Sequence, residues 1–275
     1  MKKKSNKLIV IFAAVAAVAC GILRFFQITT LTDLDTGWFL KGSEFGGIMI
    51  YIALALSAAI FIALAILGKK KGDAAYYLSS DGMGSNATRF LGIAEFVSGL
   101  LIASEVLGDN NPFQIAAIVI SALSLIVSGF MLLGHIVPPA ITGHLKLVTA
   151  IGFFLRTTNF FGSDLTVLTH AENLIVLLSY VCATYFLISS ARFYSRLETR
   201  KSRLREVIAA GAAFIPSMTH TVSFLAATFF GSEGAKRFVS LNMDIAATAI
   251  ISGMFLFVLF FTEKKKTLIP LADEE

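Results

Sequence analysis

Long apolar runs, separated by short polar stretches, make up most of this chain. Each run is about 20 residues long, and a helix of that length, rising about 1.5 Å per residue, crosses the roughly 30 Å hydrocarbon core of a bilayer. Backbone groups in lipid must be satisfied within their own segment, and the sequence lacks the alternating pattern of membrane strands. We therefore predict an all-α integral membrane protein of about eight transmembrane helices, at residues 8–28, 45–68, 90–108, 113–135, 142–161, 173–191, 207–230 and 238–262.

Composition supports the membrane class. Of the 275 residues, 56% are hydrophobic and 15% are charged, and the mean hydropathy is +0.78. A soluble domain of this size carries about 25% charged residues. The two cysteines, Cys20 and Cys182, both lie inside apolar runs, so the sequence indicates neither a disulfide framework nor a Cys/His metal site.

The lysines and arginines predict the orientation of the helices. With a cytoplasmic N-terminus, 18 of the 23 basic residues fall in inner segments and five on the outer side, as the positive-inside rule requires. Both termini are then cytoplasmic, in a multi-pass protein of the cytoplasmic membrane. The same distribution explains the net charge of +5 without a nucleic-acid partner, because basic loops face the anionic inner leaflet.

The first residues resemble a lipoprotein signal peptide, because basic residues precede an apolar stretch that contains Cys20. Two features oppose cleavage there. Ala17 is a poor match to the leucine that usually precedes such a cysteine, and the apolar run continues past Cys20 to Ile28. We therefore expect this segment to remain as the first transmembrane helix.

A short motif recurs near the ends of the first and fifth predicted helices. Both helices carry a Leu-Arg pair followed by an amide side chain, Arg24 with Gln27 and Arg156 with Asn159. A Ser-Gly pair likewise recurs in the fourth and eighth helices, at residues 128–129 and 252–253. Small residues at such positions also favour close helix contacts.

The collinear order of these motifs predicts two parallel four-helix repeats, one in residues 1–137 and one in residues 138–275. Because each repeat has an even number of spans, both halves insert the same way round. A pseudo-twofold axis would then run along the membrane normal, with a shared interface between the halves.

Ionisable side chains inside the apolar helices are the main candidates for function, because each costs about 2.5–3.5 kcal/mol on insertion scales. Counted along the helices at about 1.5 Å per residue, four of them share a layer in the outer half: Arg24, Arg156, His220 and Asp244. The other candidates for a ligand site or proton pathway are Gln27, Asn159 and, nearer the inner face, Glu95.

The residue types suggest two roles for this layer. Arg24 and Arg156 would present forked donors to a small anionic ligand or a lipid headgroup. His220 and Asp244 could carry a proton. The structural alternatives are that each arginine extends to the interface, that His220 simply hydrogen-bonds Asp244, and that Glu95 pairs with Arg89.

The sequence leads to three functional hypotheses. The first is a transporter or permease with a polar site in the outer half, between the repeats. The alternative is a non-catalytic membrane subunit or scaffold that assembles with a partner protein or as an oligomer. The third is a lipid-modifying enzyme that uses His220 and Asp244 within hydrogen-bond reach, so enzymatic activity is left undecided. No HExxH or paired central histidines occur, and we predict no metal or cofactor.

Overall fold

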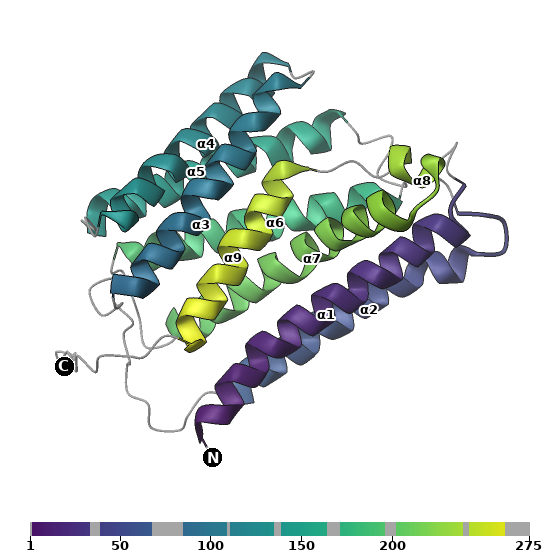
Figure 1. Ribbon diagram of the computed structural model, residues 1–275, viewed down its shortest axis with the longest axis horizontal. Coiled ribbons are helices and arrows are strands. Elements are labelled where there is room, and N and C mark those ends of the chain that lie inside the picture. Colours follow the sequence, from purple (N-terminus) through teal and green to yellow (C-terminus); the bar gives the residue numbers. More distant parts are fainter. Residues whose placement is uncertain are drawn as a thin grey trace.

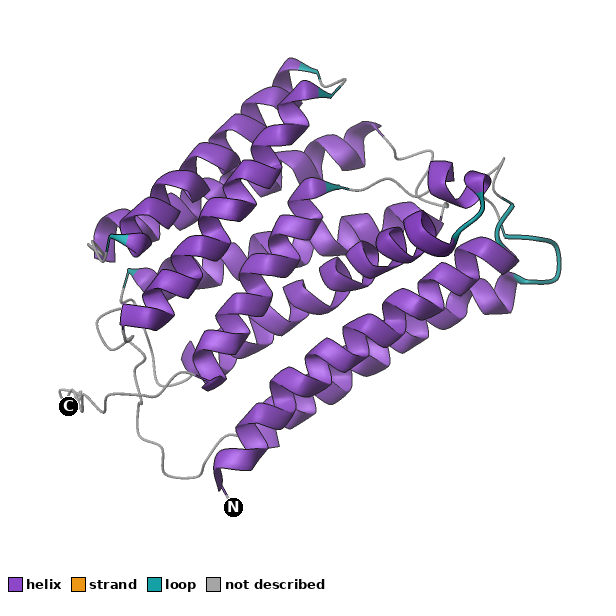
Figure 2. Ribbon diagram, in the orientation of Figure 1, coloured by secondary structure: helices purple, strands orange, loops and turns teal. Residues whose placement is uncertain are grey.

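The structure is a computed structural model that describes residues 2–33, 39–67, 85–108, 111–134, 139–163, 171–195, 202–238 and 242–261. Within these ranges the chain forms helices joined by short loops and turns, with one isolated β-bridge between Thr32 and Phe39 (Figure 2). The helices are α1 (Lys2–Leu31), α2 (Glu44–Leu67), α3 (Ser85–Ser104), η2 (Glu105–Leu107), α4 (Pro112–Leu133), α5 (Pro139–Ser163), α6 (Ala171–Tyr194), α7 (Ser202–Phe230), α8 (Glu233–Phe238) and α9 (Met243–Phe261).

Seven of the described helices are long and apolar enough to cross a membrane: α1, α2, α3, α4, α6, α7 and α9. This confirms a polytopic helical membrane protein. The eighth long helix, α5, has 25 residues but is less apolar, because it carries Lys146, Arg156 and several threonines. The number of eight spans therefore stays a prediction that depends on α5.

Local sequence explains where α4 begins, after the turn predicted around residues 108–112. Asn111 caps the helix by accepting a hydrogen bond from the backbone N–H of Gln114, whose side chain bonds back to the backbone of Asn111. Pro112 occupies the first turn, where a missing N–H has no consequence. The predicted boundary before the last span is less accurate, since residues 233–238 form the short helix α8 and α9 starts at Met243.

Six helices pack side to side in a closed order, each against the next: α3, α4, α5, α6, α7, α9 and again α3 (Figure 1). The hairpin of α1 and α2 packs on the outside of this arrangement, mainly against α7. A contact between α6 and α9 crosses the interior, where the rings of Phe186 and Phe255 lie 5.5 Å apart. The helices α3, α4, α5, α6 and α9 therefore form a closed ring of packed neighbours, which we call the five-helix ring.

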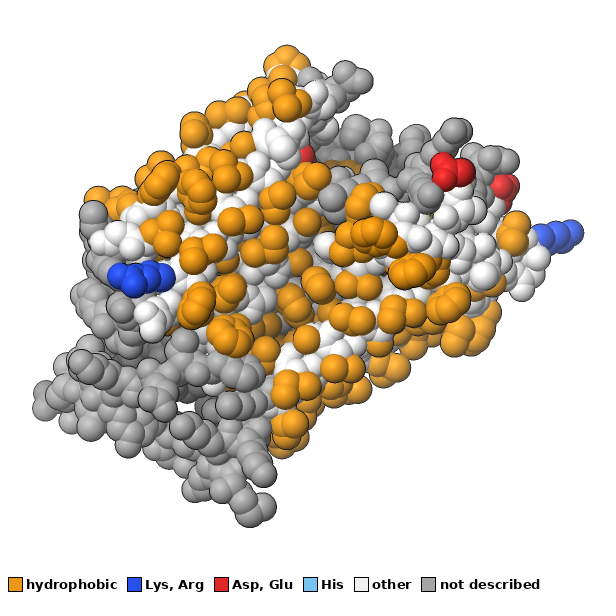
Figure 3. Space-filling view, viewed as in Figure 1, with side chains coloured by type: hydrophobic (Ala, Val, Ile, Leu, Met, Phe, Trp, Pro, Cys, Tyr) orange, Lys and Arg blue, Asp and Glu red, His pale blue; other side chains and the backbone are white. Residues whose placement is uncertain are grey.

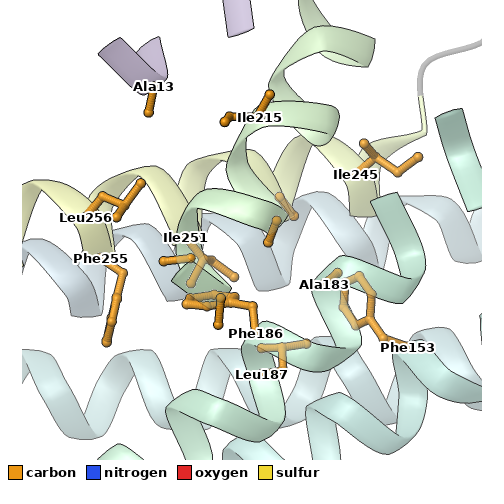
Figure 4. Packing of buried hydrophobic residues seen from close by; sticks show 14 of the residues in the cluster. Ala13, Phe153, Ala183, Phe186, Leu187, Ile215, Ile245, Ile251, Phe255 and Leu256 are labelled. Atoms are coloured by element: carbon orange, nitrogen blue, oxygen red, sulfur yellow. The ribbon is translucent and has the colours of Figure 1, made fainter. Parts of the chain in front are cut away.

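The buried core surrounding that contact is aromatic and aliphatic. Figure 4 shows Phe186 and Leu187 of α6 close to Ile251 of α9, with Phe153 of α5 near Ala183. The outward faces of the helices carry many large exposed hydrophobic side chains, which are spread across the described part of the face seen in Figure 3. An apolar surface of this extent fits contact with lipid and not with water.

The two halves of the chain do not have the same packing neighbours. Helix α7 packs principally against α1, α2, α6 and α9, whereas its predicted counterpart α3 packs against α4 and α9. A symmetric duplication would give these two helices equivalent neighbours. The repeat therefore stays a prediction.

Glycines bring α3 and α4 into close contact, as the Ser-Gly motif predicts. A Cβ placed on Gly129 of α4 would lie 2.7 Å from the backbone nitrogen of Phe96 and 2.9 Å from the carbonyl oxygen of Gly92, both on α3. Backbone atoms cannot move aside without separating the helices. Only a residue without a side chain therefore fits at this position.

We expect Gly129→Ala to destabilise the protein by about 1–3 kcal/mol, because the added methyl overpacks the α3–α4 contact. The matched control is Gly162→Ala on α5, where no atom lies within 4 Å of the added Cβ. Thermal unfolding in detergent measures the difference. Equal midpoints for the two variants would contradict the proposed close contact.

Candidate functional site

Two of the four side chains predicted to share a polar layer meet in the structure. Nε of Arg156 on α5 lies 2.9 Å from Oδ2 of Asp244, at the start of α9. Asp244 is fully buried and Arg156 is 13% exposed. Residues 88 positions apart in the chain thus form an ion pair inside the five-helix ring.

Glu105 completes this site and was not singled out in the sequence. Its Oε2 lies 2.5 Å from Nη2 of Arg156, and its Oε1 accepts a hydrogen bond from the backbone N–H of Asp244 at 3.1 Å. The short helix η2, which continues α3, places the carboxylate there. The sequence does indicate Glu105 as a candidate, because it is an ionisable residue within the predicted span 90–108.

Tyr180 of α6 is the fourth residue of this site. The guanidinium carbon of Arg156 lies 5.9 Å from the centre of the Tyr180 ring. We call Glu105, Arg156, Tyr180 and Asp244 the Arg156 cluster. Helices α3–η2, α5, α6 and α9 each contribute one member.

The Arg156 cluster has two carboxylates for one guanidinium. With both acids ionised it carries a net charge of −1 in a largely buried setting, where unbalanced charge is costly. An anion would have to displace a carboxylate from Arg156, whereas a proton or cation would neutralise the excess. The arrangement therefore favours a positively charged ligand over the anion suggested by the arginines alone.

A second buried ion pair lies deeper in the ring. Glu95 of α3 pairs with Lys146 of α5, and each side chain is 1% exposed. Ser128 of α4 donates a hydrogen bond of 2.6 Å to Oε2 of Glu95, and the Lys146 ammonium lies 5.4 Å from the ring centre of Tyr194 on α6. We call these four residues the Glu95 cluster.

The pairing of Glu95 with Arg89 suggested by the sequence is wrong. Six residues along a helix turn the side chain by about 240°, so the two residues point to different faces. Arg89 is exposed, while Glu95 faces the interior and binds Lys146 and Ser128. A basic residue on another helix satisfies the buried acid.

The two clusters repeat one pairing along the same two helices. Glu95 and Glu105 are ten residues apart, and so are their partners Lys146 and Arg156. Ten helical residues rise about 15 Å. The ion pairs therefore stand about 15 Å apart along the ring, and α5 supplies the cation in both.

Hydroxyl groups occupy the α4–α5 contact between the two clusters. Oγ of Ser124 lies 2.7 Å from Oγ1 of Thr149. One turn further along α4, Ser121 packs directly on Gly152, because a Cβ there would collide with the serine oxygen. Ser121, Ser124, Ser128 and Thr149 are all buried, and we call them the hydroxyl row.

Arg24 belongs to a different part of the molecule. It is 1% exposed on α1 and donates to Oε1 of Gln27, whose amide in turn donates to the carbonyl oxygen of Gly47 on α2 at 2.7 Å. The contacts of Arg156 are with Glu105, Asp244 and Tyr180. The two predicted arginines thus have separate partners and do not form one site.

The remaining candidates also have separate surroundings. Asn159 accepts a hydrogen bond of 3.3 Å from the side chain of Asn111, which joins α5 to the start of α4. His220 is 3% exposed on α7, next to Thr219, which bonds to the carbonyl oxygen of Ala17 on α1. Among the described residues, the carboxylate of Asp244 pairs with Arg156 and not with His220.

A third buried acid lies outside the two clusters. Glu206 of α7 is 1% exposed and accepts a hydrogen bond of 2.8 Å from Ser189 of α6. Over the part of the chain that the structure describes, no three His, Cys, Asp or Glu side chains are grouped in a way that could hold a metal ion.

We expect Glu95→Gln to destabilise the protein by about 3–5 kcal/mol, because it leaves the Lys146 ammonium buried without a counter-charge. The double variant Glu95→Gln/Lys146→Met removes both charges and should recover most of that loss. Thermal unfolding in detergent compares the two with the parent protein. A double variant no more stable than the single one would show that the ion pair does not govern stability here.

Comparison with known protein families, curated proteins and solved structures finds no match to this chain.

Proposed function

We propose that the chain is a multi-pass membrane transport protein whose pathway runs through the five-helix ring. The observation that carries this proposal is the pair of buried ion clusters, with the buried hydroxyls of the hydroxyl row on α4 and α5 between them. Together they place polar groups along about 15 Å of an otherwise apolar bundle. Transported ions and polar solutes need such groups because lipid and apolar side chains offer them no partners.

The cost of these charges argues against a purely structural role. Each ionisable residue in a spanning helix costs about 2.5–3.5 kcal/mol on insertion scales, and five of them lie in the ring. The α3–α4 contact shows that close glycine packing and aromatic contacts also join helices in this fold. Buried ion pairs are weak evidence for stability compared with apolar packing, so a transport role explains their presence better.

Both halves of the chain contribute to the pathway. Residues 1–137 supply α3 and α4, and residues 138–275 supply α5, α6 and α9. Sites between two halves are common in transporters, and we retain two parallel repeats as part of the proposal. With the positive-inside orientation, the Glu95 cluster lies towards the cytoplasm and the Arg156 cluster in the outer half.

A water-accessible interior distinguishes a transport protein from the scaffold alternative. In a background in which Cys20 and Cys182 are replaced by alanine, we expect Ser121→Cys to react with a water-soluble methanethiosulfonate reagent in proteoliposomes. Only a hydrated cysteine forms the reactive thiolate readily. Leu123→Cys, on the lipid-facing side of the same helix, should react at least about tenfold more slowly.

A second control is Leu125→Cys, at a fully buried apolar position one residue from Ser124. If Ser121→Cys and Leu125→Cys are equally unreactive, the ring is dry. The transport proposal would then fail, and a non-catalytic subunit that binds a partner would become the better reading.

A further inference from the structure

We propose that the Arg156 cluster binds a small organic cation with N–H donors, a guanidinium or alkylammonium ion, which exchanges with the head group of Arg156. This inference rests on the proposed function and names the class of solute that the pathway takes. It draws on three observations: two carboxylate oxygens that contact one cationic group, an aromatic ring beside that group, and the position of the cluster near the ends of its helices.

The two carboxylates each direct one oxygen at the same cation. Oε1 of Glu105 already accepts the backbone N–H of Asp244, and Oδ1 of Asp244 accepts the backbone N–H of Ile245. The other two oxygens, Oε2 of Glu105 and Oδ2 of Asp244, both contact the guanidinium of Arg156. A cation with at least two N–H donors fits between such fixed acceptors, and guanidinium and ammonium ions have them.

Aromatic rings complete the surroundings of this cation. The guanidinium carbon of Arg156 lies 5.9 Å from the centre of the Tyr180 ring. The rings of Phe153 and Phe160 on α5 lie 6.4 and 6.1 Å from that of Tyr180. Aromatic rings attract organic cations, and the attraction is stronger where water is excluded. A free organic cation would therefore find here the same two kinds of contact that Arg156 makes.

Arg156 does not satisfy the site completely. Its Nη1 is buried and makes no hydrogen bond to the residues that the structure describes. Oδ2 of Asp244, on a fully buried side chain, forms an ion pair with Nε of Arg156 at 2.9 Å but no hydrogen bond within the described residues. Unmatched buried donors and acceptors cost free energy. A free cation is not tethered to α5, so it can turn to place a donor on each oxygen.

The exchange leaves the buried charge unchanged. One cation replaces another, so the net charge of the cluster stays at −1, whereas an anion would add to it. The displaced side chain of Arg156 also has a destination. It lies seven residues before the end of α5 at Ser163, a rise of about 10 Å. Long arginine side chains near a helix end extend to the membrane interface.

The cluster lies where a solute can reach it. Asp244 is the second residue of α9, and Glu105 begins the three-residue helix η2 at the end of α3. The side chains of Arg156 and Glu105 are 13% and 15% exposed, whereas those of Lys146 and Glu95 are each 1% exposed. A solute that approaches from this end of the ring therefore meets the Arg156 cluster first.

A metal cation fits these groups less well. A hard cation takes about six to eight oxygen ligands, and two of the four carboxylate oxygens in the cluster already accept backbone N–H groups. The described part of the chain also offers no group of three His, Cys, Asp or Glu side chains there that could hold a metal ion. The donor pattern therefore favours a cation that supplies its own N–H groups.

The test measures equilibrium binding of radiolabelled guanidinium to the full chain in detergent, at concentrations far below those that unfold proteins. We expect the parent protein to bind it weakly, because Arg156 competes for the same carboxylates. Arg156→Gln removes the competitor and should raise the affinity at least about tenfold. If Arg156 instead holds an anionic ligand, this variant will lose acetate binding and gain no guanidinium binding, which would overturn the inference.

Two further variants serve if Arg156→Gln, with two uncompensated acids, does not fold. Arg156→Gln/Glu105→Gln has the same net charge of −1 as the parent cluster and should retain guanidinium binding through Asp244. Adding Asp244→Asn removes the last charge and should lower the affinity at least about tenfold. Equal affinity in the double and triple variants would show that the acids do not bind the cation.

Competition tests the chemical class of the ligand. Unlabelled methylammonium should displace guanidinium, whereas tetramethylammonium, which has no N–H donor, should compete at least about tenfold less well. Equal competition by the two ions would contradict recognition through the carboxylate oxygens.

The matched control is Arg24→Gln, at an arginine on α1 that is 1% exposed and bonds to Gln27. It should bind guanidinium as the parent protein does, and thermal midpoints of all variants identify any that do not fold. A gain in affinity equal to that of Arg156→Gln would show that the effect does not arise at the Arg156 cluster.

Two outcomes separate this inference from the broader proposal. If Ser121→Cys is water-accessible but neither the parent nor Arg156→Gln binds guanidinium, the cation inference fails while a pathway for another solute stands. If Ser121→Cys is inaccessible, the transport proposal fails whatever the binding result. Binding that rises in Arg156→Gln and falls when Glu105 and Asp244 are neutralised would support exchange at the cluster itself.

Discussion

Charge that is buried in a bilayer must meet opposite charge within the protein, and this requirement organises the five-helix ring. Two acids of α3 and η2 face two bases of α5, at Glu95 with Lys146 and at Glu105 with Arg156. Burying either the acids or the bases without their partners would cost a large amount of folding free energy. Helix α5 must therefore lie where both of its bases reach the ring interior. The polar character that makes α5 less apolar than the other long helices is the same feature that ties it to α3.

The surrounding helices fit around that constraint. Glycine contacts hold α4 against α3, and the small Gly152 lets α4 approach α5, so Ser124 and Thr149 come into hydrogen-bond contact. Helix α9 adds Asp244 to the second ion pair and gives it excess negative charge. The α1–α2 hairpin, which contains Arg24, packs against α7 outside the ring, so its polar residues serve a different part of the molecule.

Sequence reasoning was strongest where a property is local. Run length and hydropathy identify the spanning helices, and the turn residues before Pro112 locate the start of α4. The same reasoning did not identify which buried charged residues contact each other. It paired Glu95 with Arg89 because the two residues are close in the sequence. It placed Arg24 and Arg156 in one site because they lie at the same depth in the membrane, but depth does not determine which helix faces are in contact. It also overlooked Glu105, although this ionisable residue lies within the predicted span 90–108.

The sequence by itself determined that this chain is a helical membrane protein with costly ionisable groups in its spans, because hydropathy and helix length depend only on neighbouring residues. Only the tertiary structure decided that Asp244, Arg156 and Glu105 form one cluster, that Lys146 neutralises Glu95, and that hydroxyls of α4 and α5 lie between them. Such contacts depend on the rotation and order of helices around the ring. Those are set by how all the packed faces fit together, which no single segment encodes.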